Sequence, residues 1–309
     1  MALSIHTNYS ALTTNTALNK SNNALATNQQ RLGTGLRINS AADDAAGLQI
    51  ATRLNAQSRG MGVAMRNVGD ATSMLQTAEG AFSEMTDIVQ RMKDLATQSA
   101  NGTNSQADRD ALQGEYDELG KELGNIINNT SYAGEKLFRA ESADEAGDGG
   151  KLTASVSFQI GATTAETMEM DASTKLTGVT GALTTLSATY KDIADSVLAD
   201  YEAPEDPVVG EEINTAAAAN TTIDTLSGAL DKIGELRAQF GANINRLNHT
   251  SNNLANMKDN TDMAKGRIMD ADFAVESANM SKNSMLMQSG ISMLKQAGQM
   301  PGMVMGLLG

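Results

Sequence analysis

"LNAQSRGMGVAMRNVGDATSMLQTAEGAFSEMTDIVQRMKDLA", residues 54–96, carries a repeat of seven residues. Apolar or small residues recur at Leu54, Met61, Val68, Leu75, Phe82, Val89 and Ala96, and the position three residues later reads Gln57, Ala64, Ala71, Ala78, Met85 and Met92. This heptad pattern predicts one coiled-coil-like helix, about 64 Å long at 1.5 Å per residue. The chain has no proline before Pro204, so nothing in this stretch forces a break.

Two further heptad seams lie elsewhere in the chain. One comprises Leu112, Tyr116, Leu119, Leu123 and Ile126; the other comprises Ile223, Leu226, Leu230, Ile233, Phe240, Ile244, Leu247 and Leu254. Arg237 and Ser251 occupy seam positions of the second and are expected to weaken it locally. Because no single helix can bury its own stripe, the three segments are predicted to pack together as a bundle.

Between these seams the spacing of apolar residues changes to two. LTASVSFQI, residues 152–160, alternates as a half-buried strand does, and ETMEMD, 166–171, supplies a hairpin partner. The spacing of the large residues at 183, 186, 190, 193 and 197 predicts a short helix. The acidic, proline-bearing stretch 201–212 is predicted to be a loop.

Both ends of the chain are poor in charge and carry thin apolar stripes. The stripes are Ala11, Leu18, Leu25 and Leu32 at the N-terminal end, and Phe273, Met280, Met287 and Leu294 at the C-terminal end, with Leu286, Met293 and Met300 beside the latter. Ten of the eighteen methionines fall in residues 257–309, and methionine suits surfaces that adapt to a partner. The ends are expected to be mobile in the monomer and to become helical with each other and with neighbouring copies. The alternative is that each end simply caps the bundle.

These patterns define a mainly α fold: long heptad-patterned helices in a discontinuous bundle of N- and C-terminal segments, a small β-hairpin region and a short variable outer segment. The expected inner domain is a terminal coiled coil of residues 1–43 and 270–309. The expected bundle comprises 44–175 and 220–269, with the hairpin near 150–171. Residues 176–219 are the expected variable surface segment.

Charge and composition exclude several classes of protein. The net charge of −14 argues against nucleic-acid binding. Residues 135–212 hold sixteen acids and five bases, so the middle of the chain is expected to be solvated. There is no cysteine, and the first residues lack the features of a Sec-type signal peptide. No apolar run is long enough to predict membrane insertion.

Catalytic and metal-binding patterns are absent from the sequence. The two histidines, His6 and His249, cannot form an HExxH zinc motif, and no nucleophile elbow, phosphate loop or dinucleotide fingerprint occurs. The adjacent Glu205 and Asp206 lie in the predicted charged loop, where paired carboxylates are ordinary surface residues. The sequence therefore predicts no enzymatic activity and no cofactor or metal.

The stretch GLRINSAADDAAG, residues 35–47, is interpreted as a joint between two helices. Gly35 suits the left-handed end of the first helix, and Ser40-x-x-Asp43 matches a loose capping box for the second. Asp44 would lie near the positive end of that helix, and Arg37 could pair with either aspartate or with a neighbouring subunit. Structural roles thus account for the residue types without a substrate.

Several segments resemble the bacterial flagellins. RLGTGLRINSAADDAAGLQIA (31–51), LATQSANGTNSQADRDALQGE (95–115), NNTSYAGEKLF (128–138), GRIMDADFAVESANMSK (266–282) and the ending QAGQMPGMVMGLLG follow the family pattern in order. The resemblance spans roughly 1–175 and 220–309. It implies a secreted, extracellular subunit, exported by the flagellar type III pathway, that polymerises into the motility filament. The methionine-rich end and modest length favour a lateral or secondary flagellar system.

The resemblance also implies partners. These are the chain itself as a helical homopolymer, an export chaperone, the filament cap, hook-junction proteins and a host Toll-like flagellin receptor. Matching receptor positions are Gln90, Arg91, Leu95 and Glu115, although the same residues could form an exposed helix face used in subunit packing. Contacts with the assembly or the chaperone are expected at Met280, Met287, Leu294, Val304, Leu307 and Leu308. Gly309 replaces the usual terminal arginine of the family.

Three other functions fit parts of the pattern. A hook–filament junction protein of the same family shares the terminal helices but usually carries larger insertions. A secreted, filament-borne enzyme would need a larger variable region with catalytic residues. A non-filament coiled-coil adaptor would not need two ends that are so low in charge.

Overall fold

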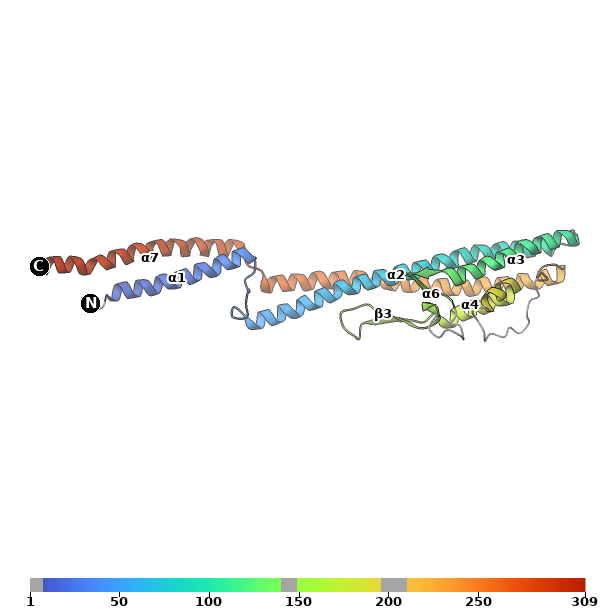
Figure 1. Cartoon of the computed structure of the whole chain (residues 1–309), viewed down its shortest axis with the longest axis horizontal. Coiled ribbons are helices and arrows are strands. Elements are labelled where there is room, and N and C mark those ends of the chain that lie inside the picture. The colour runs from blue at the N-terminus through green and yellow to red at the C-terminus, as the bar shows by residue number, and fades with distance from the viewer. Residues whose placement is uncertain (1–7, 140–148, 196–209, 309) are drawn as a thin grey trace. The chain divides into compact units, whose positions relative to one another are not determined.

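The computed structural model describes residues 8–139, 149–195 and 210–308, and for 192–195 and 300–308 it describes the backbone only. The helices are α1 (Tyr9–Thr34), α2 (Ala45–Ser99), α3 (Gln106–Asn129), α4 (Ser173–Leu186), α5 (Ala188–Asp195), α6 (Ala216–Met269) and α7 (Phe273–Leu308) (Figure 1). The mainly helical fold with a small hairpin region is thus confirmed.

Contacts divide the chain into two units. The terminal unit comprises residues 1–59 and 257–309, and the central unit comprises residues 60–256. The division falls within α2 and α6, whereas the boundaries expected at 43/44 and 269/270 fall in the loops before α2 and α7. The assignment of domains within an assembly therefore stays a prediction.

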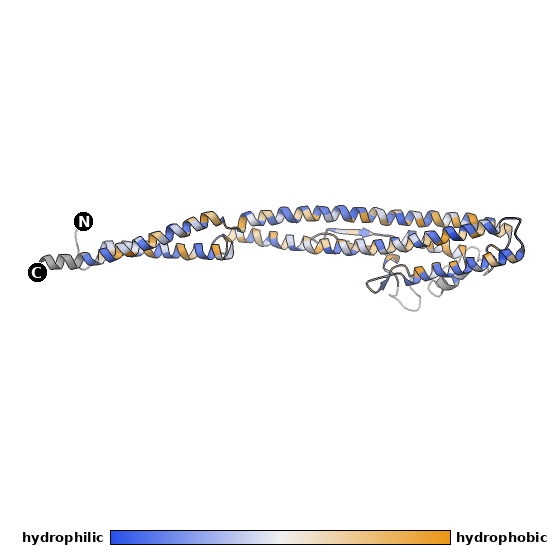
Figure 2. Cartoon of the chain, turned by 90° about the horizontal axis from the view of Figure 1, so that it is seen from above, coloured by the Kyte–Doolittle hydropathy of each residue, from blue (hydrophilic) through white to orange (hydrophobic). Residues whose placement is uncertain are grey.

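The core of the central unit is built from the predicted heptad seams of α2, α3 and α6. Along α2 the seam from Met61 to Ala96 is buried, and Leu54, which belongs to the terminal unit, is half-buried. The Phe82 ring lies 4.8 Å from the Phe138 ring, edge to face, and 5.9 Å from the Phe240 ring. Figure 2 shows apolar residues recurring among polar ones along the two long helices, α2 and α6. The seams were therefore placed correctly from the sequence.

Arg237 interrupts the α6 seam as expected and has polar partners on α2. Its guanidinium forms an ion pair with Glu79, with Nη2 2.8 Å from Oε1, and donates a second hydrogen bond to the Thr86 hydroxyl. Polar contacts from Arg237 thus link α6 to α2 at a seam position that holds no apolar residue.

Two antiparallel hairpins accompany the helices. β3 (Val156–Gln159) pairs with β4 (Thr167–Met170), which confirms the predicted hairpin, with Val156 opposite Met170. The predicted strand began at 152, but Lys151–Thr153 form a 3₁₀ turn instead, because the Leu152 N–H bonds the Leu137 carbonyl. Sequence patterns did not predict β1 (Ser131–Tyr132) and β2 (Glu135–Lys136).

The segment expected to hold one short helix from residue 183 holds two. α4 begins ten residues earlier, at Ser173, and α5 follows after Ser187. The described part of 176–219 also contributes side chains to the core, among them Leu176, Val179 and Leu183. Val197 and residues 201–209 of the predicted loop lie outside the described residues.

A buried polar cluster fastens α3 to the α4–α5 turn. The Glu212 carboxylate accepts hydrogen bonds from the Ala188 N–H at 3.0 Å and from the Gln113 amide at 2.5 Å. The same Gln113 amide donates to Asp117. Burial, as the largest cause, raises the pKa of both Glu212 and Asp117.

In the terminal unit, α1 and α7 lie side by side and antiparallel (Figure 1). The Asn8 amide at one end donates to the Ala297 carbonyl at 2.7 Å, and Arg31 at the other end contacts Glu276. The N-terminal stripe of Ala11, Leu18, Leu25 and Leu32 is half-buried, as are Met280, Met287 and Leu294 of the C-terminal stripe. Phe273 was predicted to join that stripe but is 65% exposed; it is the first residue of α7.

Candidate assembly site

The joint of the terminal unit comprises residues 33–47 and 266–272. At its first helix end, Gly35 has φ 72° and its N–H bonds the Arg31 carbonyl, so the predicted left-handed cap is confirmed. A side chain at this φ would be strained, which explains glycine here.

The two connections of the joint are hydrogen-bonded to each other. The Arg37 N–H bonds the Met269 carbonyl at 2.6 Å, and the Ala271 N–H bonds the Gly35 carbonyl at 2.9 Å. The Arg37 guanidinium donates to the Ile268 carbonyl at 3.0 Å, at the end of α6. Arg37 was expected to pair with Asp43 or Asp44. Among the described residues its partner is this helix carbonyl, which carries the negative end of the helix dipole.

The capping of α2 differs from the prediction. Ser40 does not begin the helix: α2 begins at Ala45, and Asp44 caps it by accepting the Gly47 N–H at 2.8 Å. The Asp43 carboxylate turns back instead, accepting the Ser40 and Asn39 N–H groups and the Ser40 hydroxyl. Those hydrogen bonds, with the Ser40 N–H first, lower the pKa of Asp43. The aspartates therefore have separate roles, one in the turn and one in the cap.

A close approach behind Asp44 requires a second glycine. A Cβ on Gly47 would lie 2.5 Å from an Asp44 carboxylate oxygen and 2.9 Å from the Ile38 side chain, which is itself buried. Gly47 was not singled out from the sequence, since nothing in the local pattern reports that contact. The signal that could have found it is its position three residues after an N-cap aspartate.

An acidic hollow of about 770 Å³ lies at the joint, lined by α6 and by residues 270–272, which connect α6 to α7. Its most constrained group is Asp262, whose pKa falls to about 2 because Lys258, Ser58 and Lys265 donate hydrogen bonds to it. At the entrance to α7, Asp272 accepts the Ala274 N–H at 2.9 Å and caps that helix. Two carboxylates of the hollow, those of Asp262 and Asp272, thus have structural partners.

The seam between α1 and α7 contains a buried polar group of three residues. Asn28 and Glu276 are each 7% exposed, and Arg31 Nη1 lies 3.0 Å from Glu276 Oε1. Within the described part of the chain, Asn28 Nδ2, Arg31 Nε and Glu276 Oε2 have no hydrogen-bond partner. Such groups favour one register of the helix pair over others.

The terminal unit exposes an unusual amount of large apolar surface. On the helix pair these residues are Tyr9 and Leu12 of α1, and Phe273, Val275, Met285, Leu286, Ile291 and Met293 of α7; Ile50, Met257 and Met263 of the same unit are exposed as well. Isolated exposed apolar residues are ordinary, but several along one pair of helices mark a surface that packs against another protein. The side chains of Val304, Leu307 and Leu308 lie outside what the structure describes.

The four positions that match a receptor site fall in the central unit. Gln90, Arg91 and Glu115 are exposed, and Arg91 Nη2 lies 2.5 Å from Glu115 Oε1, which joins α2 to α3. Leu95 is fully buried in the core, so the expectation of one exposed face holds for three of the four residues and is wrong for Leu95. Its heptad neighbour Ala96 is buried as well, so two adjacent residues of α2 belong to the core here.

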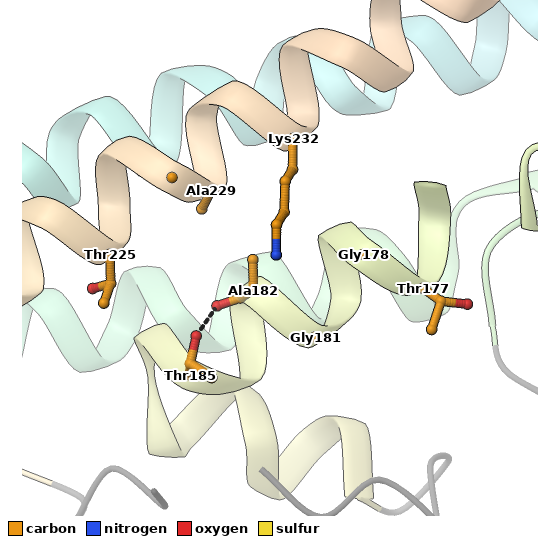
Figure 3. A pocket seen from close by; sticks show the side chains of 9 residues that line it. Thr177, Gly178, Gly181, Ala182, Thr185, Thr225, Ala229 and Lys232 are labelled. Atoms are coloured by element: carbon orange, nitrogen blue, oxygen red, sulfur yellow. Dashed lines mark hydrogen bonds between the residues drawn. The ribbon is translucent and has the colours of Figure 1, made fainter. Parts of the chain in front are cut away.

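A shallow groove of about 320 Å³ lies between α4 and α6 of the central unit (Figure 3). Small residues line it on both helices, and the Lys232 side chain extends from α6 toward α4. The Thr185 hydroxyl donates a hydrogen bond to the Ala182 carbonyl of its own helix. The groove is therefore accounted for by close helix packing.

A helix pair with an exposed apolar surface, joined through a hydrogen-bonded turn to long core helices, defines a self-associating structural subunit. Family comparison agrees: the model of the bacterial flagellin N-terminal helical region matches residues 5–143, and that of the C-terminal helical region matches 223–308. Flagellin A of Vibrio anguillarum is 36% identical and polar flagellin C of Vibrio parahaemolyticus is 34% identical, both over all of each chain. The chain belongs to the bacterial flagellin family.

A solved structure extends the comparison of folds. A putative flagellar hook-associated protein from Vibrio parahaemolyticus is similar with a TM-score of 0.55 and 16% identity, covering 74% of this chain and all of that one. At that identity the likeness shows the fold alone.

Membership of the family defines the role of the chain. Flagellins are structural subunits of the extracellular flagellar filament, used in motility, and this chain is not an enzyme. Across the residues described, no helix is both long and apolar enough to cross a membrane.

Proposed function

We propose that the chain polymerises through the exposed apolar residues of α1 and α7, with a second copy of the terminal unit as the partner. The observation that carries the proposal is the set of exposed residues on a paired helix almost free of charge: past Glu276, α7 carries only Lys282 and Lys295. When this surface meets a different surface of the terminal unit of the next copy, and the rotation between copies does not close a ring, the repeated heterologous contact produces a helical filament.

Val275 and Leu286 provide the test, because both are exposed and their replacement leaves the monomer core unchanged. The double change Val275→Ser and Leu286→Ser should raise the monomer concentration needed for growth from filament seeds about tenfold or more. Val63→Ser, at a residue 46% exposed in the central unit, is the matched control and should elongate normally. Elongation of the double variant at the wild-type concentration contradicts the proposal.

The joint residues are proposed to hold the terminal helices at a defined angle during assembly. Support comes from the bond between Arg37 and the α6 carbonyl and from the Asp44 cap, which stiffen both connections. Ser40, Asp43 and Gly35 complete the same turn. Arg37→Ala and Asp44→Ala should weaken filament formation or stiffness while the central unit keeps its stability; normal filaments from both variants would refute this role.

The inner and outer layers proposed for the filament follow the distribution of charge. The low-charge ends 1–43 and 270–309 are proposed as an inner coiled coil, and the bundle segments 44–175 and 220–269 as the next layer. The segment 176–219 is proposed as the outermost layer, although Leu176, Val179 and Leu183 within it pack in the core of the central unit. Burying residues that carry few charges costs little desolvation energy, which favours this order over its reverse.

Export and capping partners are proposed from the family. The chain would leave through the flagellar type III pathway, accompanied by a chaperone that binds the region of Val304, Leu307 and Leu308, and would meet the cap and hook-junction proteins at the filament ends. A pull-down with and without residues 303–309 tests this contact.

Recognition by a host Toll-like flagellin receptor is proposed to involve Gln90, Arg91 and Glu115. The burial of Leu95 gives it a supporting position beneath them. Arg91→Ala should reduce receptor signalling, whereas Lys93→Ala on the same helix is the control.

A further inference from the structure

We propose that Met285 and Met293 form an oxidation-sensitive site on α7: hydroperoxide converts them to sulfoxides in the free chain, and the oxidised chain cannot add to a filament. The inference rests on the proposed assembly role of α7. It concerns two side chains of this sequence and a chemical modification, so it can fail while the assembly role stands.

Exposure separates these two methionines from others in the chain. Met285 is 65% exposed and Met293 is 60% exposed, while Met280 and Met287 on the same helix are half-buried against α1. Met85 and Met92 in the central core are fully buried. Because thioether oxidation follows access of the oxidant to sulfur, the two exposed residues of α7 should react well before the core residues.

Their position ties the modification to assembly. Met293 lies seven residues after Leu286 and eighteen after Val275, and both intervals are close to whole turns of an α-helix, so the three residues share one flank. Met285 directly precedes Leu286 and adjoins that flank. The sulfurs therefore lie on the apolar surface proposed to contact a second copy.

The chemistry is a two-electron oxygen transfer. The sulfur lone pair attacks the terminal oxygen of hydrogen peroxide, the O–O bond breaks, and a proton moves to the departing oxygen, which leaves as water. Sulfur is oxidised and the peroxide is reduced. The product carries a strongly polar S=O group, and burying such a group in an apolar contact without a hydrogen bond is unfavourable. The filament itself should protect both residues, because there the contact excludes the oxidant.

The experiment treats full-length monomer with hydrogen peroxide, locates sulfoxides by peptide mass spectrometry and measures growth from untreated seeds. Met285 and Met293 should oxidise ahead of Met85 and Met92, and the monomer concentration needed for growth should rise about tenfold or more. Methionine sulfoxide reductases should restore growth. Assembled filaments treated identically should show little sulfoxide at either position.

Two variants assign the effect to these residues. The double variant M285L/M293L should elongate seeds and resist peroxide, whereas M263L, which removes a sulfur 56% exposed on α6, should stay peroxide-sensitive. M285Q/M293Q, with polar side chains in place of the sulfoxides, should elongate poorly without any oxidant.

The outcomes separate the two proposals. Failure of untreated wild-type chain to elongate contradicts the assembly role itself. Normal elongation by chain that carries sulfoxide at both positions overturns the oxidation site alone, as does normal elongation by M285Q/M293Q.

Discussion

Arg31 of α1 and Glu276 of α7 form an ion pair with 3.0 Å between Nη1 and Oε1, although 245 residues separate them in the chain. Glu276 is largely buried and Arg31 is partly exposed. Since the seam around them is built from thin stripes of small and polar residues, this pair sets the register in which α1 and α7 meet.

Arg31→Ala is expected to destabilise the α1–α7 pair by about 1–3 kcal/mol, because it leaves a buried carboxylate without its cation. Hydrogen exchange of the α1 and α7 amides in the full chain measures this, and the amides of α3 provide the internal control. The exchanged pair Arg31→Glu with Glu276→Arg should recover part of the loss. Unchanged exchange in Arg31→Ala would show that the pair contributes no stability.

Gly35→Ala should lower the stability of the terminal unit by about 1–2 kcal/mol, because an alanine at φ 72° is strained. Gly33→Ala is the matched control: it lies inside α1, and among the described residues no atom lies within 4 Å of where its Cβ would stand. That change should be neutral or slightly stabilising. Equal effects of the two substitutions, measured by thermal unfolding, would contradict the capping role of Gly35.

Phe82→Ala should destabilise the central unit by about 3–5 kcal/mol, since the ring is fully buried between Phe138 and Phe240. Urea unfolding followed by circular dichroism measures the loss. Val63→Ala on the exposed side of α2 should change stability by less than about 0.5 kcal/mol. A small effect at Phe82 would mean that the three-ring contact is not the centre of the core.

The stability of the central unit should increase as the pH falls from neutral toward the ordinary carboxylate range. Burial raises the pKa of Glu212 and Asp117 in the folded chain, so the folded state takes up protons before the unfolded state does. The gain is fully present below the unfolded pKa values and is lost as the pH rises through the folded ones. Below about pH 3.8 the lowered pKa of Asp108, caused by hydrogen bonds from Ser105, acts in the opposite direction.

Tyrosine fluorescence in urea follows this dependence, since Tyr116 and Tyr190 are buried next to the cluster. Glu212→Gln should flatten the pH dependence between neutral pH and about pH 4.5 while weakening one hydrogen bond, because the Gln113 amide then faces a second amide. A slope identical to that of the wild type would show that Glu212 does not titrate in this range.

Much of the architecture could be predicted because a heptad repeat of apolar residues indicates a long helix. The α2 stripe from Met61 to Ala96 and the α6 stripe through Phe240 were read from spacing alone. The end of α1 could also be predicted, because glycine adopts the left-handed backbone found at Gly35 more readily than other residues do. The β3–β4 hairpin followed from alternation, but its strand is shorter than the pattern because Leu152 bonds a distant carbonyl.

Two of the features that could not be predicted depend on contacts between distant residues, whereas the capping patterns are local. The pattern Ser-x-x-Asp was assigned to the start of α2 at Ser40, where the helix begins later. The same pattern at Ser105 forms a full capping box on α3 and was overlooked. The partner of Arg37 is a helix-end carbonyl 231 residues away, which local sequence does not report. Burial of Leu95 next to the seam residue Ala96 likewise depends on the packing of the core around two adjacent residues of α2.

The central claim, that the terminal helix α7 drives filament assembly, is tested most directly by electron microscopy of seeded growth with and without residues 275–309. Full-length chain should extend seeds into long filaments, while the truncated chain should remain unassembled with its central unit still folded by circular dichroism. Filaments of normal length and number from the truncated chain would contradict the account.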